Sequence, residues 1–389
     1  MRVLFVTYGF SGHLKPMVAL GWALRAAGHE VMVASHPYFT ETITSSGLPA
    51  LPAGPPFDLE GEVRKVAIPA SWRTLRAATP AERRERWADL EVLRPAIHGA
   101  EVIAGDLVSF ARSWPCDLVV YEPMGFAGPL VAKVLDIPAV RHLWTVDLTV
   151  PLQKFESVLF GDLMTPFGLD SLGVNGDLSL DPCPSRLQVD DGFPRQQMRY
   201  VPYNGPAVLP RWLREPAKRR RICISWGTSL TNNGLYQTFL APLAVQAVAD
   251  LDVEVVLAIA DSQRSLFDDE LPSNVIAAGP IGLDLLLPTC DALIHHGGGG
   301  TLMNAVVHGV PHLVVPYIPD CCCNAIQIVK TGAGVKVMGE DATVESLRSA
   351  VREVLEPRYR EAARTLQAEL EALPTPAETV PSLEKLSAV

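Results

Sequence analysis

The chain opens with hydrophobic residues in the pattern of a strand, a helix and a second strand. Residues 2–8 form a continuous apolar run, which predicts a buried strand. After a Gly/Ser turn, apolar residues recur at helical spacing up to Gly28, and residues 29–35 form the next apolar run. Two strands joined by a helix of this length pair in parallel with a right-handed crossover. The pattern returns as a strand, a helix and a strand at residues 116–122, 125–136 and 137–144.

The same alternation restarts after residue 221. The predicted strands are residues 222–226, 253–260, 274–279, 292–296 and 312–317, and the predicted helices lie near residues 234–249, 283–290, 302–309 and 323–331. Between the two halves, residues 150–200 have weak periodicity and are predicted as loops and short helices. Residues 201–221 are rich in proline and break both periodicities.

Two α/β domains of the Rossmann-like kind follow from this alternation, each with an open parallel sheet. We predict an N-terminal domain at 1–205, a linker at 206–221, a C-terminal domain at 222–375 and a closing helix at 376–389 that crosses back to the first domain. Ligands of open parallel sheets bind at the carboxyl ends of the strands. The function is therefore expected in a cleft between the two facing sheets.

The composition excludes several classes of partner. At 389 residues the chain is long enough for two domains, and its 48% hydrophobic content suits a well-packed enzyme. A formal net charge of −10 leaves no basic surplus for a nucleic acid. No run of 18 or more apolar residues occurs, and the N-terminus lacks the pattern of a signal peptide, so no membrane partner is expected. Seven cysteines, an odd number, favour the reducing cytoplasm.

Four consecutive glycines, Gly297–Gly300, separate the predicted strand 292–296 from the next helix, which Thr301 opens. Each glycine costs about 0.5–1 kcal/mol relative to alanine inside regular structure, so the run needs a reason. A helix N-terminus presents unpaired N–H groups, and glycines let a phosphate approach them. Thr301 and His296 add side-chain donors. We predict a phosphate site; a glycine-rich turn needed only for packing is the alternative. The segment has neither the P-loop nor the dinucleotide-binding pattern.

Residues 295–320 resemble the donor-binding segment of GT-B glycosyltransferases of family 1, which modify natural products. Residues 180–188 and 201–212 are similar to the actinobacterial branch that attaches deoxysugars to polyketide aglycones. With the N-terminal sequence "GHLKP", the resemblance covers most of the chain. It implies a GT-B fold, a nucleotide-sugar donor and a small-molecule aglycone.

The resemblance also implies roles for individual donor-site residues. It places His296 on the pyrophosphate and Thr301 as the small hydroxyl residue beside it. The acidic ribose-binding residue of the family falls on Asn304, and its Asp-Gln pair for sugar hydroxyls falls on Asp320 and Cys321, which fits a deoxysugar. The base-stacking tryptophan of plant relatives falls on Ala278, so backbone groups near Ile281 are expected to hold the base. Three hydroxyl residues at the end of the strand 222–226 and just beyond it are further donor candidates, with turn formation as the alternative: Ser225, Thr228 and Ser229.

The predicted acid–base pair is His13 with Glu122. His13 follows the first strand at the start of a helix, where a helix N-terminus favours the neutral imidazole. Transfer to a hydroxyl needs such a base, because the acceptor proton leaves as oxygen attacks the anomeric carbon. Glu122 ends the strand 116–122 at the same sheet edge and matches the acidic residue, more often Asp in the family, that orients the histidine. The acceptor contacts are expected to be His142, Trp144 and Trp72.

We therefore predict an inverting, metal-independent glycosyltransferase that moves a dTDP-activated deoxysugar to a hydrophobic aglycone of secondary metabolism. No cofactor or metal is expected. The sequence Asp250-Leu-Asp252 lies at the wrong sheet edge for a metal, and Cys321–Cys323 cannot all face one ion. His295 is expected to pack beside the glycine loop. A sugar-nucleotide epimerase of similar shape and a non-catalytic sugar-nucleotide-binding partner are the alternatives. A homodimer and dependence on an activator protein stay open.

Overall fold

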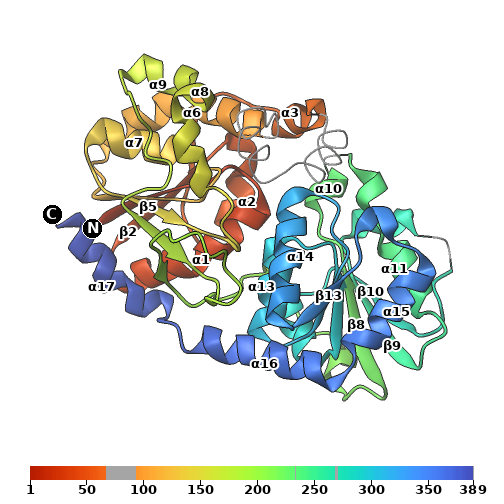
Figure 1. Ribbon diagram of the computed structural model, residues 1–389. Coiled ribbons are helices and arrows are strands. Elements are labelled where there is room, and N and C mark those ends of the chain that lie inside the picture. Colours follow the sequence, from red (N-terminus) through yellow and green to blue (C-terminus); the bar gives the residue numbers. More distant parts are fainter. Residues whose placement is uncertain (67–92, 233, 268–269, 389) are drawn as a thin grey trace. The chain divides into compact units, whose positions relative to one another are not determined.

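The computed structural model describes residues 1–66, 93–232, 234–267 and 270–388. These residues divide into two compact units, each built around one sheet (Figure 1). The first unit contains Met1–Pro182, Asp190–Arg199 and Pro374–Val389, and the second contains Cys183–Val189 and Tyr200–Leu373. Residues 206–221, interpreted as a linker from their proline content, lie inside the second unit, as do residues 183–189 and 200–205.

All strands of the first unit run parallel in one sheet, in the order β3-β2-β1-β4-β5-β6-β7. Strand β1 lies near the middle, and its apolar residues are buried because helices cover both faces of the sheet. The strands are β1 (Arg2–Val6), β2 (Glu30–Ser35), β3 (Ala50–Pro52), β4 (Leu118–Tyr121), β5 (Ala139–His142), β6 (Leu178–Asp181) and β7 (Gln196–Gln197).

Helices cover this sheet on opposite faces, with α6 and α7 on one side and α1 and α17 on the other (Figure 1). The helices of the unit are α1 (Ser11–Ala26), α2 (Thr40–Thr44), α3 (Leu59–Lys65), α6 (Arg94–Ser113), α7 (Ala127–Leu135), α8 (Glu156–Leu159), α9 (Gly161–Met164) and α17 (Pro376–Ser387). The hydrophobic core lies between these layers.

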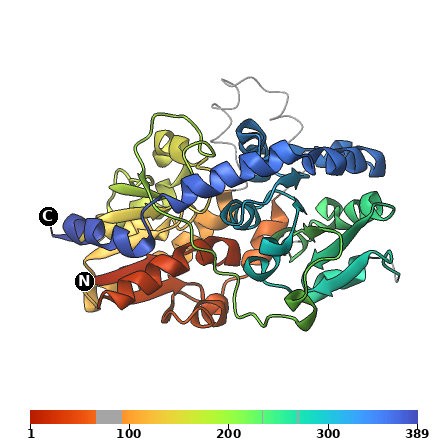
Figure 2. The ribbon, with the colours of Figure 1, turned by 90° about the horizontal axis from the view of Figure 1, so that it is seen from below.

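The C-terminal helix α17 packs against α1, and the two helices lie side by side in both views (Figure 2). Thr375 begins α17 with a capping box, because its hydroxyl accepts the Glu378 N–H at 3.2 Å while Glu378 accepts the Thr375 N–H at 2.8 Å. His29 lies 3.0 Å from Glu384 of this helix. The last residues of the chain therefore stabilise the unit in which the chain begins.

The second unit repeats the design with a six-stranded parallel sheet, in the order β10-β9-β8-β11-β12-β13. The strands are β8 (Arg220–Ser225), β9 (Val253–Ala258), β10 (Val275–Gly279), β11 (Ala292–His295), β12 (His312–Val314) and β13 (Gly334–Lys336). The helices are α10 (Ser229–Asn232), α11 (Ala241–Val248), α12 (Leu283–Leu286), α13 (Gly299–Val307), α14 (Pro319–Thr331), α15 (Val344–Val354) and α16 (Pro357–Glu371). Both halves are thus parallel α/β sheets, as the hydrophobic pattern predicts.

Two details of the predicted secondary structure are wrong. Residues 150–200 contain the expected short helices, α8 and α9, but also β6 and β7, which extend the first sheet and were not expected. These strands have four and two residues, which is too short for a periodic signal among proline, glycine and aspartate. The helix expected from residue 234 begins instead at Ala241, where Pro242 occupies the first turn. Proline favours that position because its missing N–H would have no partner there.

Candidate active site

Each sheet has one point where the order of the strands reverses. In the first sheet β1 lies between β2 and β4, and in the second β8 lies between β9 and β11. Ligands of open parallel sheets bind beyond the carboxyl ends of the strands at such a point. His13 and Glu122 follow β1 and β4, whereas Thr228 and His296 follow β8 and β11. Each unit therefore has candidate residues at the edge of its sheet where a ligand is expected.

His13 and Glu122 form a hydrogen-bonded pair. His13 Nδ1 lies 2.9 Å from Glu122 Oε2, and the Glu122 side chain is fully buried. Glu122 also accepts the backbone N–H of Tyr8 at Oε1 and of Met124 at Oε2, both at 2.8 Å. These two backbone bonds fix the carboxylate in place. The side chain of glutamate, one methylene longer than the aspartate more usual in the resembled family, therefore still reaches the histidine.

The hydrogen bonds of Glu122 determine which nitrogen of His13 carries the proton. A carboxylate only accepts hydrogen bonds, so His13 donates an N–H from Nδ1. In the neutral imidazole the lone pair then lies on Nε2. This arrangement gives His13 a nitrogen that can accept a proton, opposite a carboxylate that stabilises the imidazolium formed.

Aromatic rings surround His13 within the first unit. The Trp144 ring lies closest, with its centroid 4.3 Å from that of His13 and the planes 32° apart. Tyr8 and Phe10 lie at 5.8 and 5.9 Å. Trp144 and Phe10 are half-buried and Tyr8 is buried. Tyr8 and Phe10 were not predicted as site residues, although their position in the turn after the first strand could have indicated them.

The other two predicted acceptor contacts have different outcomes. His142 is fully buried in β5 and donates from Nδ1 to the Leu143 carbonyl at 2.7 Å. Burial lowers its pKa to about 4, so the ring is neutral. His142 Nε2 is buried and has no hydrogen-bond partner among the described residues, so the role of His142 as an acceptor contact stays a prediction. Trp72 lies outside the described residues.

Three of the four consecutive glycines, Gly297–Gly300, differ in what a Cβ atom would contact. Gly297 has φ of +99°, which favours glycine, and a Cβ there would lie 2.9 Å from the Cys321 carbonyl oxygen. A Cβ on Gly298 would lie 2.6 Å from His296 Nε2. A Cβ on Gly300 would meet nothing within 4 Å. Packing therefore explains Gly297 and Gly298, whereas no contact of the described residues requires glycine at position 300.

The N-terminus of α13 combines backbone donors with a buried histidine. Gly298 is its N-cap residue, and no side chain caps the first turn. His296 packs against Gly227, where a Cβ would lie 3.0 Å from the imidazole Cε1, and burial lowers the pKa of His296 to about 4. His296 Nδ1 is buried and has no hydrogen-bond partner among the described residues. An oxygen of a bound anion could satisfy these unpaired donors.

Asn304 and Cys321 are both buried in the second unit. Asn304 is buried, donates to the Gly300 carbonyl at 2.8 Å and accepts from Asn204 at 2.9 Å. Its amide is therefore engaged within the unit rather than presented to a ribose. Cys321 is also buried, and burial raises the pKa of its thiol well above the usual range. The thiol is therefore neutral, and its place at the donor sugar stays a prediction.

The remaining predicted donor residues lie at the same sheet edge. Ser225 ends β8 and is buried, whereas Thr228 and Ser229 are exposed in the turn that follows. The half-buried residues are Ile281, Thr301 and Asp320. The side chain of Gln263, 36 residues from Gly227, donates to the Gly227 carbonyl and to Thr231 Oγ1. No local sequence signal indicates that Gln263 supports this turn.

His295 packs beside the glycine loop, as predicted. Its Nδ1 accepts the Gly297 N–H at 3.1 Å, and its Nε2 lies 3.2 Å from His312 Nδ1. Both rings are fully buried, and burial lowers both pKa values, that of His312 to about 3. His295 Nε2 therefore donates to His312 Nδ1. The pair of neutral histidines orients Gly297 from beneath the loop.

The two aspartates of the Asp250-Leu-Asp252 sequence, considered above as metal ligands, form ion pairs with arginines. Asp250 pairs with Arg348 and Asp252 with Arg219, each at 3.3 Å. Within the described residues, no group of three or more His, Cys, Asp and Glu side chains is arranged to hold a metal ion.

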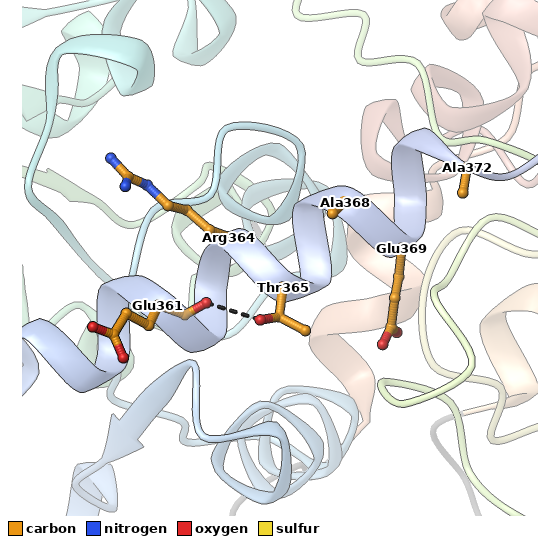
Figure 3. A pocket seen from close by; sticks show the side chains of 6 residues that line it. All are labelled: Glu361, Arg364, Thr365, Ala368, Glu369 and Ala372. Atoms are coloured by element: carbon orange, nitrogen blue, oxygen red, sulfur yellow. Dashed lines mark hydrogen bonds between the residues drawn. The ribbon is translucent and has the colours of Figure 1, made fainter.

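A shallow groove runs along α16 in the second unit (Figure 3). Its lining residues belong to that one helix, except Ala372, which directly follows the helix, and within the helix the Thr365 hydroxyl donates to the Glu361 carbonyl at 3.0 Å. The groove lies on a helix rather than at the ends of the strands, and none of the predicted site residues lines it. The lining residues are Glu361, Arg364, Thr365, Ala368, Glu369 and Ala372.

Comparison with known proteins decides the family. A family model described as "Erythromycin biosynthesis protein CIII-like, N-terminal domain" matches residues 22–227, and the corresponding C-terminal domain model matches residues 243–386. This chain belongs to the family of erythromycin biosynthesis protein CIII-like proteins, called the CIII-like family below. The matched ranges contain Glu122, Trp144 and the glycine loop, whereas His13 precedes the first range.

Named proteins match this chain along its whole length. It is 34% identical over 417 residues to 3-alpha-mycarosylerythronolide B desosaminyl transferase of Saccharopolyspora erythraea, with 100% of this chain and 99% of the relative covered. The glycosyltransferase VinC in complex with dTDP is 34% identical, with a TM-score of 0.82 and both chains fully covered. Spinosyn rhamnosyltransferase SpnG complexed with spinosyn aglycone is 30% identical, with a TM-score of 0.84, covering 99% of this chain and 100% of that one.

The CIII-like protein is therefore a glycosyltransferase with the GT-B fold, and the predicted fold and enzyme class are confirmed. Neither alternative from the sequence, an epimerase or a non-catalytic binding partner, corresponds to the activities of these named relatives. In the described part of the chain, no helix combines the length and the hydropathy needed to cross a bilayer.

Proposed function

We propose that this CIII-like glycosyltransferase transfers a deoxysugar from a dTDP-sugar to a hydrophobic natural-product aglycone, with inversion and without a metal ion. His13 is the general base. The observation that carries the proposal is the pair of His13 with the buried Glu122, which directs the imidazole N–H to the carboxylate and leaves Nε2 to accept a proton.

The reaction is a single displacement. The acceptor hydroxyl oxygen attacks the anomeric carbon of the donor, and the bond from that carbon to the diphosphate oxygen breaks with departure of dTDP. His13 Nε2 takes the hydroxyl proton as the new bond forms. Glu122 stabilises the resulting imidazolium through the 2.9 Å contact at Nδ1. Attack on the face opposite the leaving group inverts the anomeric centre.

The second unit supplies the groups that would hold the donor diphosphate. The N-terminal amides of α13 carry no side-chain cap, and His296 contributes a neutral buried imidazole. Thr301, half-buried in the first turn of α13, contributes a hydroxyl donor. Preorganised donors of this kind stabilise charge that develops on a leaving group, so we propose that they act in place of a metal ion. The complex of the relative VinC with dTDP supports this donor.

The proposed substrates follow from the site residues and from the relatives. Trp144 and Phe10 give the surroundings of His13 an aromatic character that suits an apolar acceptor. The relative from Saccharopolyspora erythraea is named as a desosaminyl transferase, and SpnG was solved with an aglycone. The buried Cys321, where the resembled family has Gln for sugar hydroxyls, fits a donor sugar with fewer hydroxyls.

Inversion without a metal can be tested with small acceptors. The purified protein is incubated with EDTA, methanol and a dTDP-deoxyhexose of known anomeric configuration. We expect slow release of dTDP and a methyl glycoside of the opposite configuration, read by NMR. Heat-treated protein gives the background. Retention of configuration, or release that stops with EDTA and returns with Mg²⁺, would contradict the proposal.

Gly300→Ala tests the anion site separately. Since a Cβ at position 300 meets nothing within 4 Å, the variant should fold and gain helix stability, up to about 1 kcal/mol. We expect weaker dTDP binding, at least about tenfold, because the new methyl group lies where the phosphate approaches the backbone. Calorimetric titration with dTDP measures the affinity. Gly105→Ala in α6, where a Cβ also meets nothing within 4 Å, is the matched control and should leave binding unchanged.

If both variants bind dTDP as tightly as the wild type, the glycine run does not receive the diphosphate. In that case the proposed donor site fails, although the acid–base pair of the first unit would be untouched.

A further inference from the structure

The imidazole of His13 has two close neighbours, one at the edge of the ring and one on its face. At the edge, Nδ1 contacts the Glu122 carboxylate at 2.9 Å. On the face, the Trp144 indole lies with its centroid 4.3 Å away and its plane tilted by 32°. Tyr8 and Phe10 are more distant, at 5.8 and 5.9 Å. Among the described residues, Trp144 is thus the aromatic ring in closest contact with the proposed base.

The segment that carries Trp144 is fixed at both ends by buried charges. Arg141 and Asp147 form an ion pair of 2.7 Å, and both side chains are fully buried. Thr149 Oγ1 accepts from Arg141 at 2.9 Å and donates to Asp147 Oδ1 at 3.0 Å. Arg195 adds a second guanidinium 3.1 Å from Asp147. Residues 142–146 therefore span a short distance between two anchored side chains, which restricts where the indole can lie.

An indole face attracts a cation, because the π electrons give it a negative potential. A neutral imidazole gains little from this contact, whereas an imidazolium gains more. We propose that Trp144 is a positioning residue that acts through His13: it stabilises the protonated ring formed during transfer and holds it in the orientation that Glu122 requires. The catalytic consequence rests on the proposed role of His13 as the base. The contact itself does not depend on that role.

This role differs from the acceptor contact expected for Trp144 from the sequence. A residue that only contacts the acceptor would change KM for the acceptor and leave the titration of His13 unchanged. A residue that stabilises the imidazolium shifts the pH at which His13 titrates, with or without substrate. The titratable groups in direct contact with His13 are Glu122 and Tyr8, and Tyr8 interacts in turn with Tyr38 and Glu62. Burial raises the pKa of Tyr8, so its hydroxyl stays neutral in this experiment.

The test is an NMR titration of the histidine ring signals between pH 5 and 9 in the full chain without substrates. The His13 signal is assigned by its loss in His13→Gln. In Trp144→Leu we expect the titration midpoint of His13 to fall by about 0.5–1 unit, because the imidazolium loses its aromatic face. Trp144→Phe keeps a weaker aromatic face and should give a smaller fall. If Trp144→Leu fails to fold, the fall measured in Trp144→Phe still tests the proposal.

Trp114→Leu is the matched control, because Trp114 packs against Phe110 in the same unit. It should leave the His13 midpoint unchanged. A midpoint within about 0.2 unit of wild type in both Trp144 variants would overturn the inference. In the pH profile of kcat/KM for dTDP release, the acid limb should move by the same amount. If the midpoint moves while His13→Ala keeps full transfer, the stacking inference holds and the proposed function fails.

Discussion

His13→Ala is expected to abolish sugar transfer while leaving dTDP binding nearly unchanged. General-base catalysis contributes about 10²–10⁴-fold to the rate, and alanine has no group to accept the proton of the acceptor hydroxyl. His13 belongs to the first unit, whereas the proposed diphosphate contacts belong to the second, so the nucleotide should bind the variant as before. Steady-state kinetics of dTDP release measures the first effect, and calorimetric titration with dTDP measures the second.

Glu122→Gln provides the companion variant. Glutamine has nearly the same size, but its N–H₂ group can donate toward His13 and favour the opposite tautomer, with the proton on Nε2. We expect a loss of kcat within the same range, again with unchanged dTDP affinity. Replacing the exposed Glu60, which forms an ion pair with Arg64 in α3, with glutamine controls for a general effect of charge. Wild-type turnover in His13→Ala would remove His13 from the mechanism.

The central strands of both sheets can be predicted from the sequence because they are buried on both faces. A strand such as β4 then consists entirely of apolar residues, and the pattern locates it within a few positions. The edge strands cannot be predicted in this way. β3 and β7 have three and two residues, and what makes them strands is a hydrogen-bonding neighbour rather than their own composition.

The candidate residues near the ends of the central strands were chosen from their place along the chain, and their catalytic and donor-binding roles stay predictions. His13, Glu122 and His296 were identified because the carboxyl ends of parallel strands meet at one edge of a sheet. Their contacts were less predictable, since position along a strand does not determine which way a side chain points. His142 ends β5 yet lies inside the core, and Asn304 is engaged by Asn204, which is distant in the sequence. Alternation and spacing contain no information about such long-range partners.

The second large expected effect concerns stability. Asp147 lies between two guanidinium groups, at 2.7 Å from Arg141 and 3.1 Å from Arg195, and its side chain is fully buried. In Asp147→Asn the fully buried Arg141 loses its counter-charge. Removing one partner of a buried ion pair costs about 3–5 kcal/mol, because the remaining charge stays away from water. In calorimetry we expect the melting temperature of the first unit to fall by roughly 10 °C, since 1 kcal/mol corresponds to a few degrees in a domain of this size.

Glu30→Gln is the matched control, because Glu30 of the same unit also pairs with an arginine, Arg2, but its side chain is 63% exposed. Solvent screens this pair, so its loss should leave the melting temperature almost unchanged. Both variants replace a carboxylate with an amide, so a difference between their melting temperatures is due to burial of the ion pair. Equal shifts in the two variants would show that the Asp147 cluster contributes no more than a surface pair. If the shift is large, Asp147→Asn should also broaden the NMR signals of Trp144, since the ion pair that anchors its segment would be lost.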